Sequence, residues 1–185
     1  PKATADLPEE AVDLPDTTVN SLTGNVGKGK AVKASVSAYK EDNTLLGTDT
    51  NLIDGAYSIP IGDYTGKVKI VANITEYIDE KLNKKITVDG LKLSAISSTS
   101  SDRRVVNVTP LTEIASRILG ESALTDSSVS IQDIADMNIY VAKASGVTDD
   151  YNPAKGEVVY LNQGSGEQEN TAVNRNGIVL LSISN

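Results

Sequence analysis

The feature that most constrains the fold is a series of short alternating segments separated by turn-forming residues. Between residues 19 and 108, apolar and polar side chains alternate over a few residues at a time, which is the pattern of half-buried strands. The pairs Asp54-Gly55 and Asp89-Gly90 are strong turn signals between such segments. The regular spacing of the segments is typical of an antiparallel β-sandwich. Candidate strands cover residues 19–26, 31–39, 45–50, 56–61, 68–74, 85–88, 91–96 and 104–108.

The pattern changes at Thr109, where the apolar spacing becomes helical. A helix is predicted over 110–119, with Thr109 as N-cap and Gly120 at its end. A second helix is predicted over 131–145, after Ser130 as N-cap. The expected buried faces contain Leu111, Ile114, Ala115 and Ile118 in the first helix, and Ile131, Ile134, Ala135, Asn138, Val141 and Ala142 in the second.

The predicted fold class is therefore mainly β with appended helices. We expect an antiparallel transthyretin-like or Ig-like β-sandwich over residues 19–108 and a small helical region over 109–185. The end of that region is ambiguous, because the apolar run 177–184 suits either a helix or a buried strand. The sandwich core must be aliphatic, since the chain has no Phe, no Trp and one Met.

Charge and residue types exclude several classes of function. The net charge of −8 argues against binding to nucleic acid and to anionic membranes, and no apolar run approaches the roughly 18 residues of a transmembrane segment. Without His or Cys, the chain cannot build catalytic triads, thiol nucleophiles or histidine metal sites. Sugar-binding enzymes usually need aromatic platforms, and Phe and Trp are absent. We expect a protein that is not an enzyme.

Residues 24–32, GNVGKGKAV, contain the G-x-x-x-x-G-K spacing of a phosphate-binding loop. The residue after Lys30 is Ala31, however, which has no oxygen for a magnesium ion. The segment that follows alternates with a period of two, so no helix N-terminus is expected there to bind an anion. The stretch is interpreted as a turn between two strands.

Calcium is the only ion for which the chain offers candidate ligands. Two loops gather side-chain oxygens: one contains Asp49, Asn51 and Asp54, and the other contains Asp149, Asp150 and Asn152. Calcium requires six to eight oxygens, and neither loop has EF-hand spacing. Asp and Asn also accept hydrogen bonds from nearby backbone in turns, and this alternative is favoured. No cofactor is predicted.

The β region resembles the carboxypeptidase regulatory-like, transthyretin-like domain of bacterial secreted and surface proteins. The resemblance is carried by V-N-S-L-T-G-N-V at 19–26, A-V-K-A-S-V-S-A-Y at 31–39, L-G-T-D-T-N-L-I-D-G-A-Y-S-I-P-I at 46–61 and V-N-V-T-P-L-T-E-I-A at 106–115. It covers about residues 19–120, and its motifs specify strands and turns. The resemblance implies a non-catalytic spacer, adhesive module or accessory domain, and it supplies no catalytic residue.

Residues 1–18 form an acidic arm with prolines at positions 1, 8 and 15. Proline lacks an N–H donor, so the arm is expected to be extended and unable to form its own helix. Such an arm can add a strand to the sheet edge of a neighbouring copy, and head-to-tail addition propagates as a filament. The candidate apolar anchors are Val12, Leu14 and Val19, with Leu7 as a weaker one.

Two functional hypotheses follow. The first is an extracellular bacterial protein that assembles with copies of itself into a surface fibre or layer. The start at Pro1 rather than Met, together with the absence of cysteine, favours a processed, secreted chain in this hypothesis. The alternative is a monomeric adhesin or carbohydrate-binding module of a larger surface protein, with a surface glycan as its partner. An accessory domain of an enzyme is the weakest interpretation.

Overall fold

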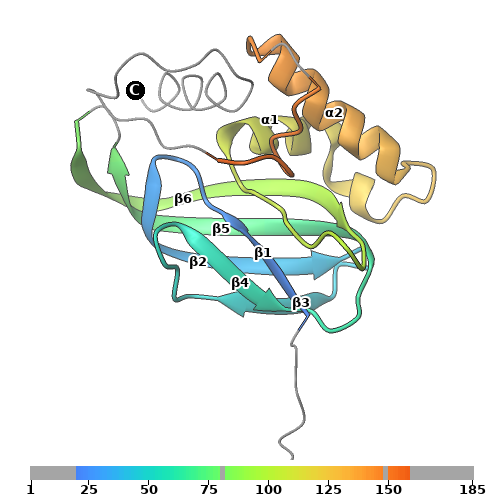
Figure 1. Ribbon diagram of the computed structural model, residues 1–185, viewed down its shortest axis with the longest axis horizontal. Coiled ribbons are helices and arrows are strands. Elements are labelled where there is room, and N and C mark those ends of the chain that lie inside the picture. Colours follow the sequence, from blue (N-terminus) through green and yellow to red (C-terminus); the bar gives the residue numbers. More distant parts are fainter. Residues whose placement is uncertain (1–19, 80–81, 148–149, 159–185) are drawn as a thin grey trace, which may run out of the picture.

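The structure is a computed structural model that describes residues 20–79, 82–147 and 150–158. Six strands form two antiparallel sheets (Figure 1). The small sheet pairs β1 (Ser21–Asn25) with β4 (Ala56–Pro60). The larger sheet has the order β3-β2-β5-β6. Its strands are β2 (Lys30–Lys40), β3 (Leu45–Asp49), β5 (Gly66–Asp79) and β6 (Lys84–Thr99).

Residues 104–108 extend the small sheet, but they run parallel to β1. Thr23 pairs with Val105 and Val26 with Val108 in parallel bridges. The predicted strand at 104–108 is thus a parallel bridged segment and not an antiparallel strand. The turn closed by the hydrogen bond from Ser100 N–H to the Arg103 carbonyl (3.1 Å) precedes it and carries the chain from one sheet to the other.

The core lies between the two sheets and is aliphatic, as the composition requires. Its largest fully buried side chains include Leu22, Val26, Val36, Ile59, Val68, Ile70 and Ile74. Tyr57 is the main aromatic contribution, and its hydroxyl donates to the Val106 carbonyl at 2.5 Å. Burial raises the pKa of the Tyr57 hydroxyl far above its ordinary value, so the hydroxyl stays protonated and keeps this hydrogen bond.

Two further strand predictions differ from the structure: β5 extends beyond the predicted 68–74 at both ends, and Asp89-Gly90 is not a turn. The two segments predicted at 85–88 and 91–96 belong to one long strand, β6. Gly90 has φ 69° inside it, and the pairing with β5 shifts register between Ile74 and Glu76. The extra residues around Gly90 therefore form a bulge. A bulge, like a tight turn, can use a residue with positive φ. By contrast, Asp54 (φ 53°) and Gly55 (φ 82°) form the two-residue hairpin turn that was predicted.

Two helices follow the strands and lie beside β6 (Figure 1). They are α1 (Pro110–Leu119) and α2 (Ile131–Ala144), with the short 3-10 helix η1 (Glu121–Leu124) between them. Thr109 and Ser130 cap α1 and α2, each in a reciprocal capping box, and Gly120 ends α1. These boundaries and caps confirm the sequence prediction, as does the fold class of a β-sandwich-like structure with appended helices. No helix among the described residues is long and apolar enough to cross a membrane.

The expected buried faces of the helices are only partly correct. In α1, Leu111 and Ala115 are buried, but Ile114 and Ile118 are 42% and 54% exposed. The buried positions next to Leu111 and Ala115 are instead polar: Thr112 and Ser116 face β6. In α2, Ile134, Asn138, Val141 and Ala142 are buried as predicted, Ala135 is half-buried, and Ile131 is exposed. The face of α1 that meets the sheet therefore differs from the predicted apolar face, because α1 directs hydrogen-bonding side chains toward the edge of β6.

Candidate functional site

The stretch that resembles a phosphate-binding loop is a turn, as interpreted. Gly24 lies inside β1, Gly29 has φ 58° in the following turn, and Ala31 is buried in β2. A Cβ at Gly24 would lie 1.9 Å from the Val106 carbonyl oxygen, so the absence of a side chain is required by the approach of residues 104–108. Lys30 binds Asp54 at 2.5 Å. Both glycines serve the fold.

In the first candidate calcium loop, the carboxylates of Asp49 and Asp54 interact with backbone N–H groups and with a lysine. Asp49 accepts the Asn51 N–H through Oδ1 and the Ser58 N–H through Oδ2, both at 2.8 Å. Asp54 sits in the hairpin turn and pairs with Lys30. The bond from Asp49 to Asn51 is the side-chain turn that the sequence favoured over calcium.

The second calcium loop lies partly outside the described residues, because Asp149 is not among them. Asp150 pairs with Lys143 at 2.7 Å, and Asn152 accepts the Ala154 N–H at 3.0 Å. Over the described part of the chain, no three acidic side chains gather in a group suited to a metal ion. The arm 1–18 and its anchors Leu7, Val12, Leu14 and Val19 also lie outside the described residues.

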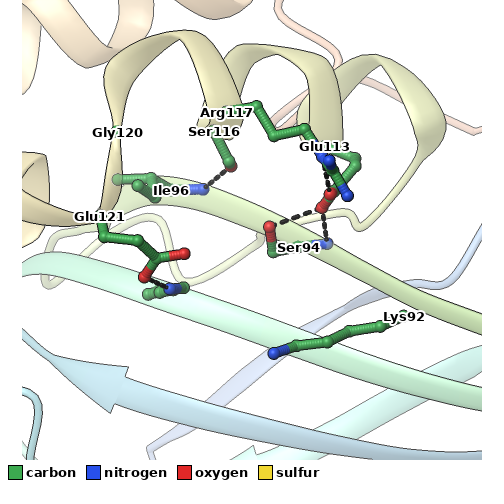
Figure 2. A pocket seen from close by; sticks show the side chains of 9 residues that line it. Lys92, Ser94, Ile96, Glu113, Ser116, Arg117, Gly120 and Glu121 are labelled. Atoms are coloured by element: carbon green, nitrogen blue, oxygen red, sulfur yellow. Dashed lines mark hydrogen bonds and ion pairs between the residues drawn. The ribbon is translucent and has the colours of Figure 1, made fainter.

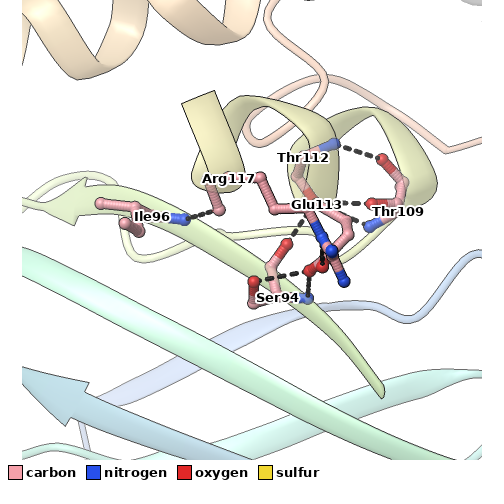
Figure 3. A network of polar contacts seen from close by, with 7 residues as sticks. Ser94, Ile96, Thr109, Thr112, Glu113 and Arg117 are labelled. Carbon is pink, nitrogen blue, oxygen red and sulfur yellow. Dashed lines mark hydrogen bonds and ion pairs between the residues drawn. The ribbon is translucent and has the colours of Figure 1, made fainter. Parts of the chain in front are cut away.

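The edge of β6 that faces away from β5 has its backbone groups hydrogen-bonded by side chains from the helical region (Figure 3). The Ser94 N–H donates to Glu113 at 2.6 Å, and the Ser94 carbonyl accepts from the Thr112 hydroxyl at 3.1 Å. One step further, the Ile96 N–H donates to the Ser116 hydroxyl at 2.9 Å, and the Ile96 carbonyl accepts from the Asn138 amide at 3.2 Å. A sheet edge satisfied in this way cannot accept another strand.

The ammonium of Lys155 continues this closure. It donates to the carbonyls of Ser98 and Val105, at 2.9 Å for Val105, and so joins β6 to the segment 104–108. Burial, helped by the nearby Arg103 charge, lowers the pKa of Lys155 to about 8. The carbonyl of Ala154 accepts the Asn107 N–H at 2.9 Å. The outer side of the segment 104–108 is therefore occupied as well.

The edge of β4 is closed by different means. The Ala56 N–H bonds to the Ile53 carbonyl at 2.8 Å within the hairpin, and the Ser58 N–H bonds to Asp49. Pro60, two residues later, has no N–H to offer. Of the alternate positions 56, 58 and 60 of β4, the first two N–H groups are thus hydrogen-bonded and the third is absent.

Strand β3 is the exception among the sheet edges. Its backbone pairs with β2, and within the described residues no other hydrogen-bond partner meets the backbone of Leu45–Asp49. Residues 84–92 of β6 also lack such caps, but Lys84, Lys85 and the bulge at Gly90 interrupt that edge. Strand β3 has an irregularity of its own, because its pairing with β2 shifts register at Leu46, between Ala38 and Tyr39 of β2. Its residues Gly47–Asp49 are regularly paired and form an open edge within the described structure.

A groove lies between α1, η1 and the outer face of β5 and β6 (Figure 2). It encloses about 450 Å³ and is lined by Lys69, Lys92, Ser94, Ile96, Glu113, Ser116, Arg117, Gly120 and Glu121. A second hollow of about 290 Å³ shares Lys69 and Lys92 with it and extends over the sheet to Tyr39, Asn43, Val71 and Asn73. The two hollows are neighbours because they share these two lysines, and together they are called the groove below.

Ion pairs organise the helical wall of the groove. Lys69 pairs with Glu121, and Arg117 Nε donates to Glu113 at 2.5 Å. Burial alone would raise the pKa of Glu113, but hydrogen bonds from Ser94 and Arg117 outweigh burial and hold that pKa below its ordinary value. The bond from Lys69 and the Lys69 charge lower the pKa of Glu121, with a smaller contribution from Lys92. Both glutamates are therefore anionic at neutral pH.

Sequence reasoning missed the groove and the caps on β6. Nothing in the spacing of Thr112, Ser116 and Lys155 marks them as partners of β6 carbonyls and N–H groups. The one available signal was Asn138, a polar residue on the predicted apolar face of α2. A buried amide must bind another polar group, so its position indicated a hydrogen bond between α2 and another element.

Comparisons of the chain with family models, with curated proteins and with solved structures find no match.

Proposed function

We propose that this chain is a non-catalytic structural subunit of a bacterial surface fibre or layer, in which the arm 1–18 adds a strand to the sandwich of a neighbouring copy. One observation carries the proposal: β3 is left as an open edge, regularly paired over Gly47–Asp49, while β4, the segment 104–108 and residues 94–98 of β6 are closed by specific hydrogen bonds. A molecule that polymerises through one edge needs the other edges protected in this way.

The lengths of the two partners agree. The arm has proline-free runs at residues 2–7, 9–14 and 16–18, and β3 spans Leu45–Asp49. Proline cannot donate in a ladder, so pairing should be strongest after Pro15 or in the run between Pro8 and Pro15, residues 9–14. Within it, Val12 and Leu14 alternate with polar residues and would share one face of the added strand.

The rim of the core beside β3 provides a surface for these anchors. Leu46 and Leu52 are only partly buried where they pack against the sandwich core. Covering them with Val12 and Leu14 would remove further apolar surface from water. The resemblance of residues 19–120 to a domain of bacterial surface proteins agrees with an extracellular location, which remains part of the proposal.

The arm is attached close to the same edge. Asn20, the first described residue, accepts the Ile61 N–H at 3.0 Å and donates to Asp63 at 2.8 Å, at the end of β4. Strand β3 passes this end of β4, since a Cβ at Gly47 would lie 2.7 Å from Ile59 Cγ2. An arm could therefore pair with its own β3 or with the β3 of a neighbour, and the experiment must separate these cases.

Size-exclusion chromatography and negative-stain microscopy of the complete chain and of a chain without residues 1–18 test the proposal. Pairing between subunits predicts polymers for the complete chain and folded monomers after deletion. Adding the shortened chain to the complete one should also shorten the polymers, because it offers an edge but no arm. If deletion instead lowers monomer stability and leaves the oligomeric state unchanged, the arm pairs within its own subunit and the proposal fails.

A second comparison tests the anchors. Replacing Val12 and Leu14 with Asp should weaken assembly more than replacing Glu9 and Glu10 with Gln. Each lost apolar anchor removes burial worth roughly 1.5–3 kcal/mol, whereas an exposed charge contributes about 0–1 kcal/mol. Equal effects of the two pairs would argue against an added strand with a buried apolar face.

The groove favours the second candidate function, a binding module for a surface glycan. It is a concave, polar surface lined by charged and amide side chains. The two functions do not exclude each other, because β3 and the groove use separate residues.

A further inference from the structure

The groove collects positive charge in an acidic protein. Lys69, Lys92 and Arg117 line it, while the whole chain carries a net charge of −8. Lys69 is largely buried, with a side chain that is 14% exposed, and is held by Glu121. Lys92 extends over the strands beneath the helical wall (Figure 2) and has neither an ion pair nor a hydrogen bond within the described residues. Within the described residues, the groove therefore contains one cation without a direct ion pair next to two that are paired.

The other end of the groove is neutral and rich in unused hydrogen-bonding groups. Asn43 and Asn73 line it together with Tyr39. None of these three side chains has a hydrogen bond to another part of the described structure. Asn43 is held with φ 62° in the turn between β2 and β3, where asparagine is tolerated. An amide offers two donors and one acceptor oxygen, which suits the hydroxyl groups of a sugar.

We propose that this groove binds an anionic oligosaccharide, specifically a glycan that carries carboxylates as uronic acids do. A ligand carboxylate would bind Lys92 and compete for Lys69 or Arg117, while sugar hydroxyls would bond to Asn43, Asn73 and the glutamates. Tyr39 supplies a half-buried ring that lines the neutral end. The two ends of the groove thus match the two kinds of group on such a sugar.

The net negative charge of the whole molecule further restricts the class of anionic ligand that the groove can bind. A densely charged polyanion such as nucleic acid would be repelled by the surrounding net negative charge and would need more cations than the groove supplies. A uronate-containing chain has at most one carboxylate per sugar and can place single charges on Lys92 and its neighbours. Binding should weaken as salt rises, but only modestly, because few charges are involved.

Calorimetric titration with a short oligogalacturonate tests the inference, with the methyl-esterified form of the same oligosaccharide as a neutral control. The acid form should bind at least about tenfold more tightly than the ester, a difference of ~1.4 kcal/mol. Binding of neither form, or equal binding of both, would overturn the proposal.

Matched lysine variants locate the site. Lys92→Gln should weaken binding of the acid form about tenfold. Lys85→Gln is the control: it lies on the same strand β6 but pairs with Glu76 outside the groove, and it should bind like the unaltered protein. Equal losses in the two variants would indicate a general charge effect and would overturn the assignment. Circular dichroism should show both variants to be folded, since both lysines are exposed.

The inference is independent of the arm. A chain without residues 1–18 should bind the oligosaccharide as tightly as the complete chain, even if assembly fails entirely. Loss of binding on deletion would mean that the ligand site needs the arm or the polymer, which contradicts a site formed by β2 and its following turn, β5, β6, α1 and η1.

Discussion

The inner face and the outer edge of strand β6 are held by different interactions. Leu93 and Ala95 face the sandwich and are buried among aliphatic side chains. The edge is bound through backbone groups of Ser94, Ile96 and Ser98, which meet polar side chains of α1, α2 and the segment that contains Lys155. Apolar burial supplies most of the free energy of folding but little direction. Hydrogen bonds contribute less energy and fix where the helices lie.

This difference explains why the helical layer tolerates exposed isoleucines. Ile114 and Ile118 stay on the surface of α1 because Thr112, Glu113 and Ser116 occupy the face that meets β6. Turning the isoleucines inward would bury more apolar area but leave the N–H groups of Ser94 and Ile96 without partners. An unpaired buried N–H costs about 1–3 kcal/mol, which is comparable to the gain from one buried side chain.

The largest effect is expected in the sandwich core. Ile70→Ala should lower the free energy of unfolding by about 2–5 kcal/mol, because Ile70 is fully buried and the truncation leaves a cavity. Ile53→Ala is the matched control, since Ile53 is 77% exposed, and it should cost below about 0.5 kcal/mol. Urea unfolding of the three proteins measures both values. Similar costs at the two positions would contradict the described core.

A smaller but more local effect is expected at the edge of β6. Asn138→Ala removes the donor to the Ile96 carbonyl and should cost about 1–3 kcal/mol. Hydrogen exchange should show that amides of α2 open more readily while those of β2 and β5 do not, because the bond specifies the helical layer and not the sandwich. Asp136→Ala, on the exposed side of the same helix, serves as control. Uniform loss of protection across both layers would show that the two regions unfold together.

The sequence could predict what depends on local spacing. The alternation in 31–39, the Asp54-Gly55 turn and the caps Thr109 and Ser130 are decided within a few residues, so β2, α1 and α2 were found nearly at their boundaries. Asp89-Gly90 misled for the same reason: a turn and a bulge both use a residue with positive φ, and only the pairing with β5 distinguishes them.

The groove and the edge caps depend instead on how elements meet. Lys69 and Lys92 share the groove because β5 and β6 are paired, and Lys155 reaches β6 from a distant segment of the chain. No local pattern encodes these contacts. The calcium loops could be judged in part, since the turn bond of Asp49 to Asn51 is local, whereas the bond of Asp49 to Ser58 requires β3 and β4 to meet.

Raising the pH should increase the stability of the fold, because it removes the cost of burying the charge of Lys155. The folded pKa of about 8 is below the ordinary value of 10.5, so between these values the unfolded chain binds a proton that the folded chain does not. Stability should therefore rise from pH 8 toward pH 9.5, by on the order of 1 kcal/mol for a partly exposed group. Above pH 10, ionisation of tyrosines in the unfolded chain opposes this gain, because burial raises the pKa of Tyr57 and Tyr151 in the folded state.

The measurement for Lys155 is urea unfolding across that pH window. Lys155→Met should abolish most of the rise, whereas Lys85→Met, at a residue whose side chain is 59% exposed, should leave it intact. A rise that persists in Lys155→Met would assign the pH dependence to another group.

The smallest effect concerns Glu113, which joins the edge of β6 to the wall of the groove. Its folded pKa lies below the ordinary value of 4.5. Its contribution to stability is therefore present above pH 4.5 and is lost as the pH falls through the folded pKa. Glu113→Gln should cost about 1 kcal/mol at pH 6, because the charge that strengthens the bonds from Ser94 and Arg117 is removed. Acid unfolding of both proteins should show this difference narrowing as the pH falls through the folded pKa, where Glu113 itself becomes neutral. A difference that stays constant with pH would mean that Glu113 acts through its shape alone, and the edge of β6 would then be closed without help from charge.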